Sequence, residues 1–218
     1  AAKELSKRKG RRTIERALLD VAKSDSFWGV RVEAVKAFSK LKSKRYSKEL
    51  MALEAGQDNR VRRAIWGALK NYQNDNDVSQ FLQNIIENDE KYYSIADAFR
   101  ALIAVDTLSA RQKVESLLDT DSHNDVIRKA AISYYGSIIN DKNYKKLKEL
   151  VSYGGTTWDA RPEAVKQLGK YVKSKPKTIE IFEELLNDNS RDVRRNAIRM
   201  LNYYGNNNHL GILDEVLE

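Results

Sequence analysis

The chain has 218 residues, enough for one domain with a substantial core, and it contains no cysteine, which excludes disulfide bonds and thiol chemistry. No apolar run approaches the roughly 20 residues of a membrane-spanning helix, and no signal-peptide pattern opens the sequence, so we expect a cytoplasmic protein without a membrane partner. The net charge is +8, but residues 1–48 alone carry 15 Lys and Arg against 5 Asp and Glu, so the remainder is close to neutral.

Apolar residues recur with helical spacing in a series of short stretches along the chain. Each stretch has an apolar pair on one face, such as Leu18 with Leu19 or Ile85 with Ile86. This spacing predicts a first helix in each of six units, over residues 13–23, 47–55, 77–88, 110–119, 143–151 and 177–187. A seventh stretch of this kind covers residues 209–217.

A more regular phrase follows each of the first six stretches. Residues 28–36 and 158–166 are identical at six of nine positions. The residue before the recurrent arginine serves as the reference position, and it returns after 31 residues and then every 33, as Val30, Val61, Ser94, Ile127, Ala160 and Val193. Apolar residues 4, 5, 8 and 11 positions later form one helical stripe, which predicts a second helix in every unit.

Residues that cap helices lie just before these phrases. Three positions before the reference residue stand Asp58, Asn124, Thr157 and Ser190. Their side chains are expected to accept hydrogen bonds from the free amides at the start of each second helix.

These patterns predict an all-α fold without strands, an α-α superhelix of six helix pairs plus a terminal helix. We expect a single solenoid over residues 1–218 with a period of about 33 residues. Ankyrin repeats share this length but carry Thr-Pro-Leu-His, which is absent, and tetratricopeptide repeats need more prolines than Pro162 and Pro176 provide. The Asp/Asn-x-x-Val-Arg-x-x-Ala pattern resembles the compact members of the HEAT-like and armadillo solenoids.

No catalytic or metal-binding motif is present in the sequence. We find no His-Glu-x-x-His, no P-loop, no Gly-x-Gly-x-x-Gly and no Gly-x-Ser-x-Gly. The two histidines, His123 and His209, belong to different units, and a surface or helix-end role suits both. We therefore predict no catalytic residue and no metal ligand in this chain.

An arginine follows the reference position in five of the six units and flanks the buried stripe, about 40° from the residue at offset five. One interpretation is a ladder that braces adjacent units through loop carboxylates such as Asp58, Asp125 or Asp192. The alternative is an anion-binding stripe on an inner face. The regular spacing follows the repeat and favours the ladder. The five residues are Arg31, Arg62, Arg128, Arg161 and Arg194.

Two tryptophans, Trp28 and Trp158, share a register two residues before the reference position. They are interpreted as wedges between repeats, or alternatively as residues that stack on a ligand. The basic segments 3–12 and 40–48 suit a phosphate backbone, but the excess charge does not continue along the solenoid, so we do not expect a nucleic-acid partner.

Residues 25–34, Asp-Ser-Phe-Trp-Gly-Val-Arg-Val-Glu-Ala, resemble the Asp-Pro-Phe-Trp-x-Val-Arg-x-Glu-Ala stretch in the C-terminal helical region of M1-family zinc aminopeptidases. Within that family, the sequence resembles the microbial enzymes that include the tricorn-interacting factors. Residues 58–64 and 92–102 resemble the next two units of that region in order. The resemblance is clear over residues 13–105.

The resemblance implies a HEAT-like domain that bounds the peptide chamber of a longer enzyme and supports its catalytic domain. Its partners would be that catalytic domain and peptides, and zinc would be the cofactor of the parent enzyme. The family's Gly-x-Met-Glu-Asn and zinc motifs are absent here, so no catalytic residue is carried over. We accordingly expect the chain to be a C-terminal part of a longer protein.

Two other functions remain open. The chain could be a stand-alone HEAT-repeat scaffold that binds another protein. It could also bind nucleic acid, as HEAT-like alkylbase glycosylases do, with Trp158 and Asp159 as the candidate contacts to a base. The near-neutral charge after residue 48 argues against the nucleic-acid function.

Overall fold

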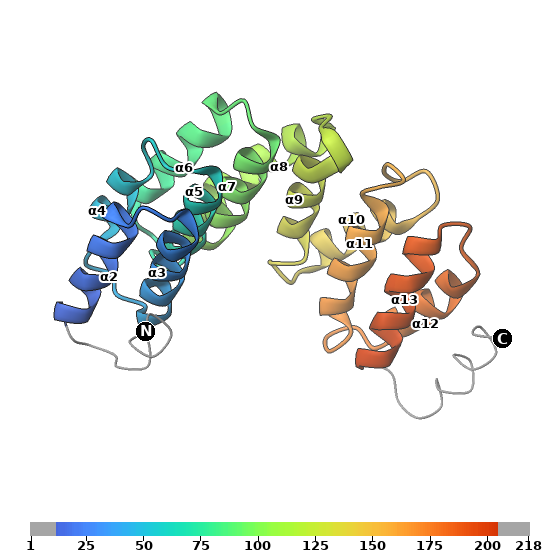
Figure 1. Ribbon diagram of the computed structural model, residues 1–218. Helices are drawn as coiled ribbons and strands as arrows, with labels where there is room; N and C mark the ends of the chain where they lie inside the picture. Colours follow the sequence, from blue (N-terminus) through green and yellow to red (C-terminus); the bar gives the residue numbers. More distant parts are fainter. Residues whose placement is uncertain (1–11, 205–218) are drawn as a thin grey trace. The chain divides into compact units, whose positions relative to one another are not determined.

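The computed structural model describes residues 12–204 and shows helices in every predicted unit (Figure 1). No strand occurs in this range, so the predicted all-α repeat fold is confirmed. The predicted terminal helix over 209–217 lies outside the described residues. The six pairs are α2 (Arg12–Ser24) with α3 (Trp28–Leu41), α4 (Ser47–Leu53) with α5 (Asn59–Leu69), α6 (Asn76–Asn88) with α7 (Tyr92–Val105), α8 (Thr107–Asp119) with α9 (Val126–Tyr135), α10 (Asp141–Val151) with α11 (Arg161–Leu168), and α12 (Thr178–Glu184) with α13 (Arg191–Tyr204).

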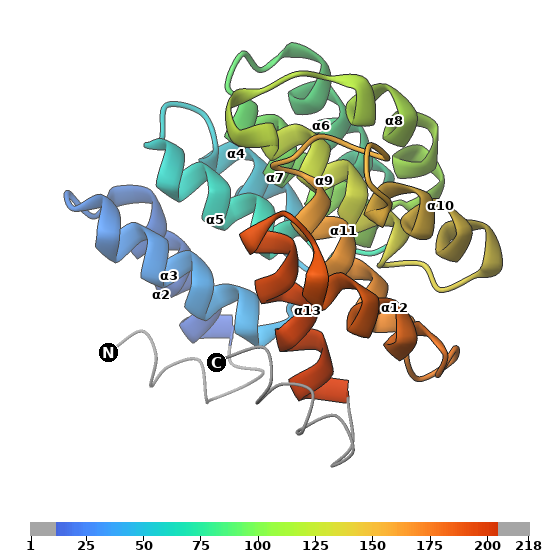
Figure 2. The same ribbon diagram turned by 90° about the vertical axis from the view of Figure 1, so that its right-hand side faces the viewer.

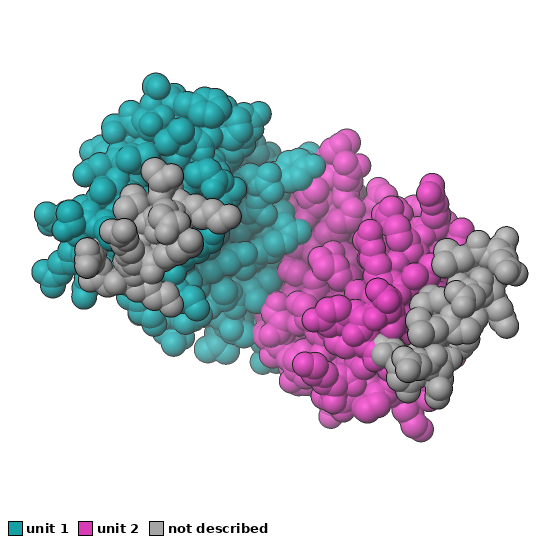
Figure 3. Space-filling model, turned by 60° about the horizontal axis from the view of Figure 1, so that its bottom comes forward, with its two compact units in different colours: residues 1–113 teal, residues 114–218 magenta. Residues whose placement is uncertain are grey.

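The chain divides into two compact units, residues 1–113 and 114–218, which Figure 3 colours separately. The division falls within α8. The first unit contains the three pairs α2 to α7, and the second contains helices α9 to α13.

Within each unit the second helices pack on one another. In the first unit α3 packs on α5 and α5 on α7, an order that can be followed in Figures 1 and 2. In the second unit α9, α11 and α13 follow in the same way. The alanine four positions after the reference residue is completely buried in five pairs, and its small side chain allows the neighbouring helix to approach. These alanines are Ala34, Ala98, Ala131, Ala164 and Ala197.

The predicted buried stripe has one clear exception. Val30 is 42% exposed, although the reference residues of the other five pairs are all buried. No described helix pair precedes α3, and the start of this helix therefore has no second helix packed against it from that side.

Two of the four predicted caps are present. Asp58 accepts a hydrogen bond from the amide of Arg60, and Ser190 Oγ accepts one from that of Val193 at 3.5 Å. The prediction is wrong for Asn124, because a 3-10 turn over His123–Asp125 precedes α9, and Ser122 Oγ accepts from the amide of Ile127 instead.

The cap prediction is also wrong for Thr157. Its hydroxyl donates to Asp125 Oδ2 at 2.6 Å and does not accept from a helix amide. This bond joins the approach to α11 to the start of α9 in the preceding pair.

Candidate functional site

The recurrent arginines form bonds inside the protein, and two of them, Arg62 and Arg161, connect successive helix pairs. Arg161 donates from Nε to the carbonyl of Val151 at 2.5 Å, and its two terminal nitrogens donate to both carboxylate oxygens of Asp188 at 3.0 and 2.6 Å. Asp188 lies in the turn before α13. This bidentate pair therefore joins α11 to the next pair in the chain.

Arg62 and Arg128 have similar surroundings. Arg62 pairs with Glu54 of its own helix pair and with Asp89 of the next pair, the latter at 2.7 Å. Arg128 donates to the carbonyl of Leu118 and pairs with Asp121 and Asp125. The pKa of Arg62 is raised, because the bonds to its two carboxylates outweigh the cost of burying its charge.

The other two recurrent arginines are held by backbone carbonyls. Arg31 donates to the carbonyl of Asp25 at 2.6 Å, and Arg194 donates to that of Asp188 at 2.6 Å. All five guanidinium groups thus have partners within the protein. An external anion would have to compete with these partners.

The acidic partners of the arginines differ in part from those expected. Asp125 does pair with Arg128, but Asp58 caps α5 and Asp192 pairs with Arg195. The carboxylates that reach from the next pair are Asp89 and Asp188. Both stand five residues before a reference position, a recurrence that the sequence contains and that would have identified them.

The two equivalent tryptophans have different environments. Trp28 begins α3, and the guanidinium of Arg60 from α5 lies 4.1 Å from its ring centroid, which connects two repeats. Trp158 is 58% exposed, so the interpretation as a packed wedge does not hold for it. The reason is Pro162, which favours a helix start beside it, so that α11 begins only at Arg161 and Trp158 stays in the preceding turn.

A groove opens on the second helices of the first unit, and we call it the second-helix groove. Its volume is about 470 Å³. Four cationic side chains and one carboxylate contribute to its lining, beside the ring of Trp28. The lining residues are Trp28, Val32 and Lys36 of α3, Arg60, Arg63, Ala64 and Gly67 of α5, Lys70 just after α5, and Asp97 of α7.

Asp97 is already shared by two arginines. Arg63 of α5 pairs with it and also lies over the ring of Tyr93. Arg100 of α7 donates to its other oxygen at 3.0 Å. The one carboxylate of the groove is therefore already bound by Arg63 and Arg100.

Lys70 is half-buried at the end of α5, and its ammonium group has no hydrogen bond or ion pair with the described residues. Burial lowers the pKa of its ammonium group, Asp97 opposes this effect, and Arg100 adds to it. Lys36, by contrast, pairs with the exposed Glu33 at 2.8 Å. The groove thus contains a partly desolvated cation whose counter-charge is not supplied by this part of the chain.

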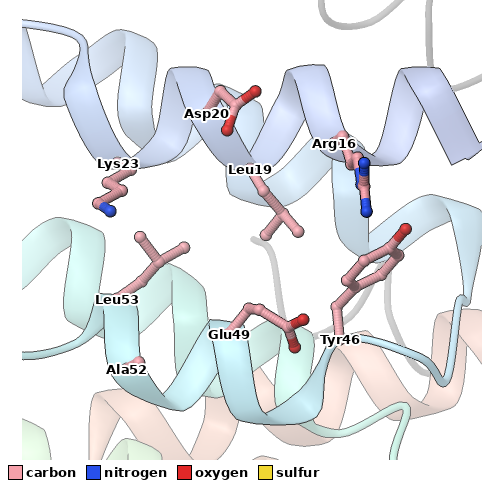
Figure 4. A pocket seen from close by; sticks show the side chains of 8 residues that line it. All are labelled: Arg16, Leu19, Asp20, Lys23, Tyr46, Glu49, Ala52 and Leu53. Carbon is pink, nitrogen blue, oxygen red and sulfur yellow. The ribbon is translucent and has the colours of Figure 1, made fainter.

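A second pocket, of about 540 Å³, lies on the first helices of the same unit between α2 and α4. Figure 4 shows Leu19 and Leu53 pointing into the space between the two helices, while Arg16 stands over Tyr46. The short α4 leaves this side of α2 partly uncovered. Arg16 and Lys23 are balanced by Asp20 and Glu49, so this pocket has no net charge to select a ligand.

The second unit has a pocket of about 400 Å³ beside Tyr153 and Arg161. Arg161 is the guanidinium already bound to Asp188. Of the other charged residues around the pocket, Lys148 is balanced by Glu184. This pocket therefore has no unpaired charge comparable to Lys70.

Within residues 12–204, no group of three or more His, Cys, Asp or Glu side chains is placed to hold a metal ion. His123 is exposed in the 3-10 turn before α9, and His209 lies outside the described range. In the same range, every helix is too short or too polar to cross a membrane.

Comparison with known families identifies HEAT repeats over residues 15–103. This segment runs from α2 into α7 and contains all the residues that line the second-helix groove. No curated protein matches the sequence closely enough to count as a relative. The chain is accordingly a helical repeat scaffold with HEAT repeats in its first unit.

Proposed function

We propose that this chain is a non-catalytic HEAT-repeat scaffold that binds polypeptide on the second helices of its first unit. The observation that carries the proposal is the second-helix groove, which three successive repeats build from α3, α5 and α7. Solenoids bind partners along the surface formed by equivalent helices of neighbouring repeats. The recurrent arginines serve the scaffold itself, since their partners are its own carboxylates and carbonyls.

More specifically, we propose that the scaffold is the helical domain of an M1-like zinc aminopeptidase and helps to bound its peptide chamber. The support is the order of the three phrases that resemble that family, over residues 25–34, 58–64 and 92–102. They fall at or near the starts of α3, α5 and α7, the helices of the groove. Zinc would be the cofactor of that enzyme's catalytic domain, as the resemblance implies.

The size of the native polypeptide tests this assignment. An antibody against the chain should detect a band several times larger than the 25.0 kDa of these residues. The purified chain should not cleave aminoacyl reporter substrates. A native band of matching size would contradict the aminopeptidase assignment, and cleavage by the purified chain alone would contradict a non-catalytic role.

The second candidate is a stand-alone protein-binding scaffold. It is favoured by the fact that the second-helix groove is complete within the first unit and needs no residue from a catalytic domain. A native band of matching size would select this candidate.

A further inference from the structure

We propose that the second-helix groove binds an acidic polypeptide segment, whose Asp or Glu side chains pair with Lys70 and Arg60. The inference rests on the proposed function only in taking a polypeptide as the partner. It does not depend on whether the scaffold belongs to an aminopeptidase.

The first argument is the charge that remains in the groove. Arg63 is paired with Asp97, and Lys36 with Glu33. Arg60 and Lys70 have no ion pair among the described residues. Both line the groove, one near the start of α5 and the other just after its end, and both can donate hydrogen bonds to a carboxylate.

Arg60 is oriented before any ligand binds. Its guanidinium lies 4.1 Å from the ring centroid of Trp28, so its plane is supported on one face. The donors at the edge of the guanidinium are not used by another side chain in the described structure. An oriented fork of this kind suits a carboxylate, which it can bind with two parallel hydrogen bonds.

Lys70 supplies the second argument. A half-buried ammonium group without a carboxylate loses hydration that no partner replaces. Asp97 is close enough to influence Lys70, but its carboxylate oxygens are bound by Arg63 and Arg100. A carboxylate from a ligand would complete this arrangement.

Gly67 supplies a third, independent argument. Glycine in a helix is less stable than alanine by about 1 kcal/mol, so a helical glycine needs a reason. A Cβ at Gly67 would meet no atom within 4 Å, and packing within the chain is therefore not that reason. The missing side chain leaves space in the groove where the backbone of a ligand can approach α5.

The groove suits a polypeptide better than a nucleic acid. Single strands bind by stacking bases on aromatic rings, but one face of the Trp28 ring is covered by Arg60. The Asp97 carboxylate can accept a further hydrogen bond from a peptide amide, a donor that the phosphate backbone of a nucleic acid lacks. The volume of about 470 Å³ accommodates a short extended segment.

The test uses the full chain and two short fluorescent peptides, one rich in Glu and one with Gln at the same positions. Both are acetylated and amidated, so that only side-chain carboxylates differ. Fluorescence anisotropy at physiological salt should show that the Glu peptide binds at least about tenfold more tightly, because hydrogen bonds to charged groups are worth this much.

Variants then locate the site. Lys70→Met removes the ammonium group but keeps most of the length of the side chain, and should weaken binding of the Glu peptide about tenfold. Gly67→Leu should abolish binding of the Glu peptide while the protein stays folded, because its side chain occupies the space beside α5 that the ligand backbone would use. Lys48→Met is the matched control, since Lys48 is an exposed lysine of α4 and does not line the groove. It should leave the affinity unchanged.

Several results would overturn the proposal. Equal affinity for the Glu and Gln peptides, with loss in Gly67→Leu, would leave a peptide groove without acidic selectivity. If Lys48→Met and Lys70→Met weakened binding of the Glu peptide equally, the lysines would act only through the net charge of the protein and not at a specific site. Tighter binding of a single-stranded oligonucleotide of the same charge would assign the groove to nucleic acid. None of these results alters the native size that tests the aminopeptidase assignment.

Discussion

Arg161 is the most buried of the repeated arginines, with one backbone carbonyl and both oxygens of Asp188 as acceptors. The Asp188 side chain is only 9% exposed. Removing the arginine would leave this carboxylate buried without its cation, which is more costly than losing an exposed ion pair.

We therefore predict that Arg161→Met lowers the free energy of unfolding by about 3–5 kcal/mol. Urea unfolding monitored by circular dichroism measures the change. Adding Asp188→Asn should recover part of the loss, because the uncompensated charge is removed. A loss in Arg161→Met no larger than that of the exposed control Arg195→Met would show that the pair does not brace the repeats.

Substitution of Lys70, in contrast to that of Arg161, is predicted to raise the free energy of unfolding. Burial lowers its pKa in the folded chain, so the charged form is less favourable there than in the unfolded chain. At neutral pH the charged lysine therefore costs stability, and this cost disappears as the pH rises through the folded pKa towards about 10.4, the unfolded value.

Lys70→Met should accordingly unfold at a higher urea concentration than the wild type near neutral pH. The difference should shrink as the pH approaches the unfolded value. Urea midpoints measured across this pH range test the prediction, and a difference that stays constant would contradict it. The same substitution is expected to weaken binding of the acidic peptide, so that the stability of the protein rises while its affinity for the peptide falls.

At the scale of the element, the start of α8 depends on Asp106. Its carboxylate accepts from the amides of Leu108 and Ser109 at 3.1 and 3.0 Å, and from the hydroxyls of Ser109 and Ser79 at 2.7 Å each. Ser79 belongs to α6. One side chain thus caps a helix and also connects it to the preceding first helix.

We predict that Asp106→Ala lowers the free energy of unfolding by about 1–2 kcal/mol at neutral pH. The hydrogen bonds from Ser109 lead the causes that lower the pKa of Asp106. Its contribution is therefore present above the unfolded pKa of about 3.9 and is lost as the pH falls through the lower folded value.

The acid dependence provides the check for Asp106. Asp106→Asn should lose less stability than the wild type when the pH is lowered below about 4, because the variant has no carboxylate to protonate. Asp77→Asn is a suitable control, since Asp77 is an exposed residue near the start of α6. Equal acid dependence of the wild type and Asp106→Asn would contradict the assignment.

The helices themselves could be predicted from the sequence because a 3.6-residue apolar period determines which face is buried. All six predicted first helices coincide with observed ones to within a few residues. The start of α11 was harder to predict, because the similarity of residues 158–166 to 28–36 suggested that both helices begin at the same position of the repeat. Pro162 changes the local backbone preference and leaves Trp158 outside the helix.

The candidate site could be predicted from the sequence only in part. The periodicity identified the arginines beside the stripe, but their partners Asp89 and Asp188 lie in turns, where side-chain reach depends on loop geometry. Arg60, Lys70 and Asp97 were not singled out. Their proximity arises only when α5 and α7 pack side by side, and a repeat pattern in one sequence does not show which charges lack a partner.

At the scale of the whole molecule, a solenoid has no single core, and its stability is roughly a sum over repeats and their neighbours. The bond between Arg161 and Asp188 lies entirely in the second unit. We predict that Arg161→Met accelerates amide exchange in α11 and α13, with exchange in α3 and α5 unchanged. Equal acceleration along the chain would indicate one cooperative core.

The most direct test of the central claim is hydrogen–deuterium exchange of the full chain with and without the Glu-rich peptide. The proposed binding surface predicts slower exchange in α5 and the adjoining parts of α3 and α7, and no such change with Lys70→Met. Protection in the first helices α2 and α4, or no protection in α5 at a peptide concentration that saturates the anisotropy signal, would contradict a polypeptide-binding surface on the second helices.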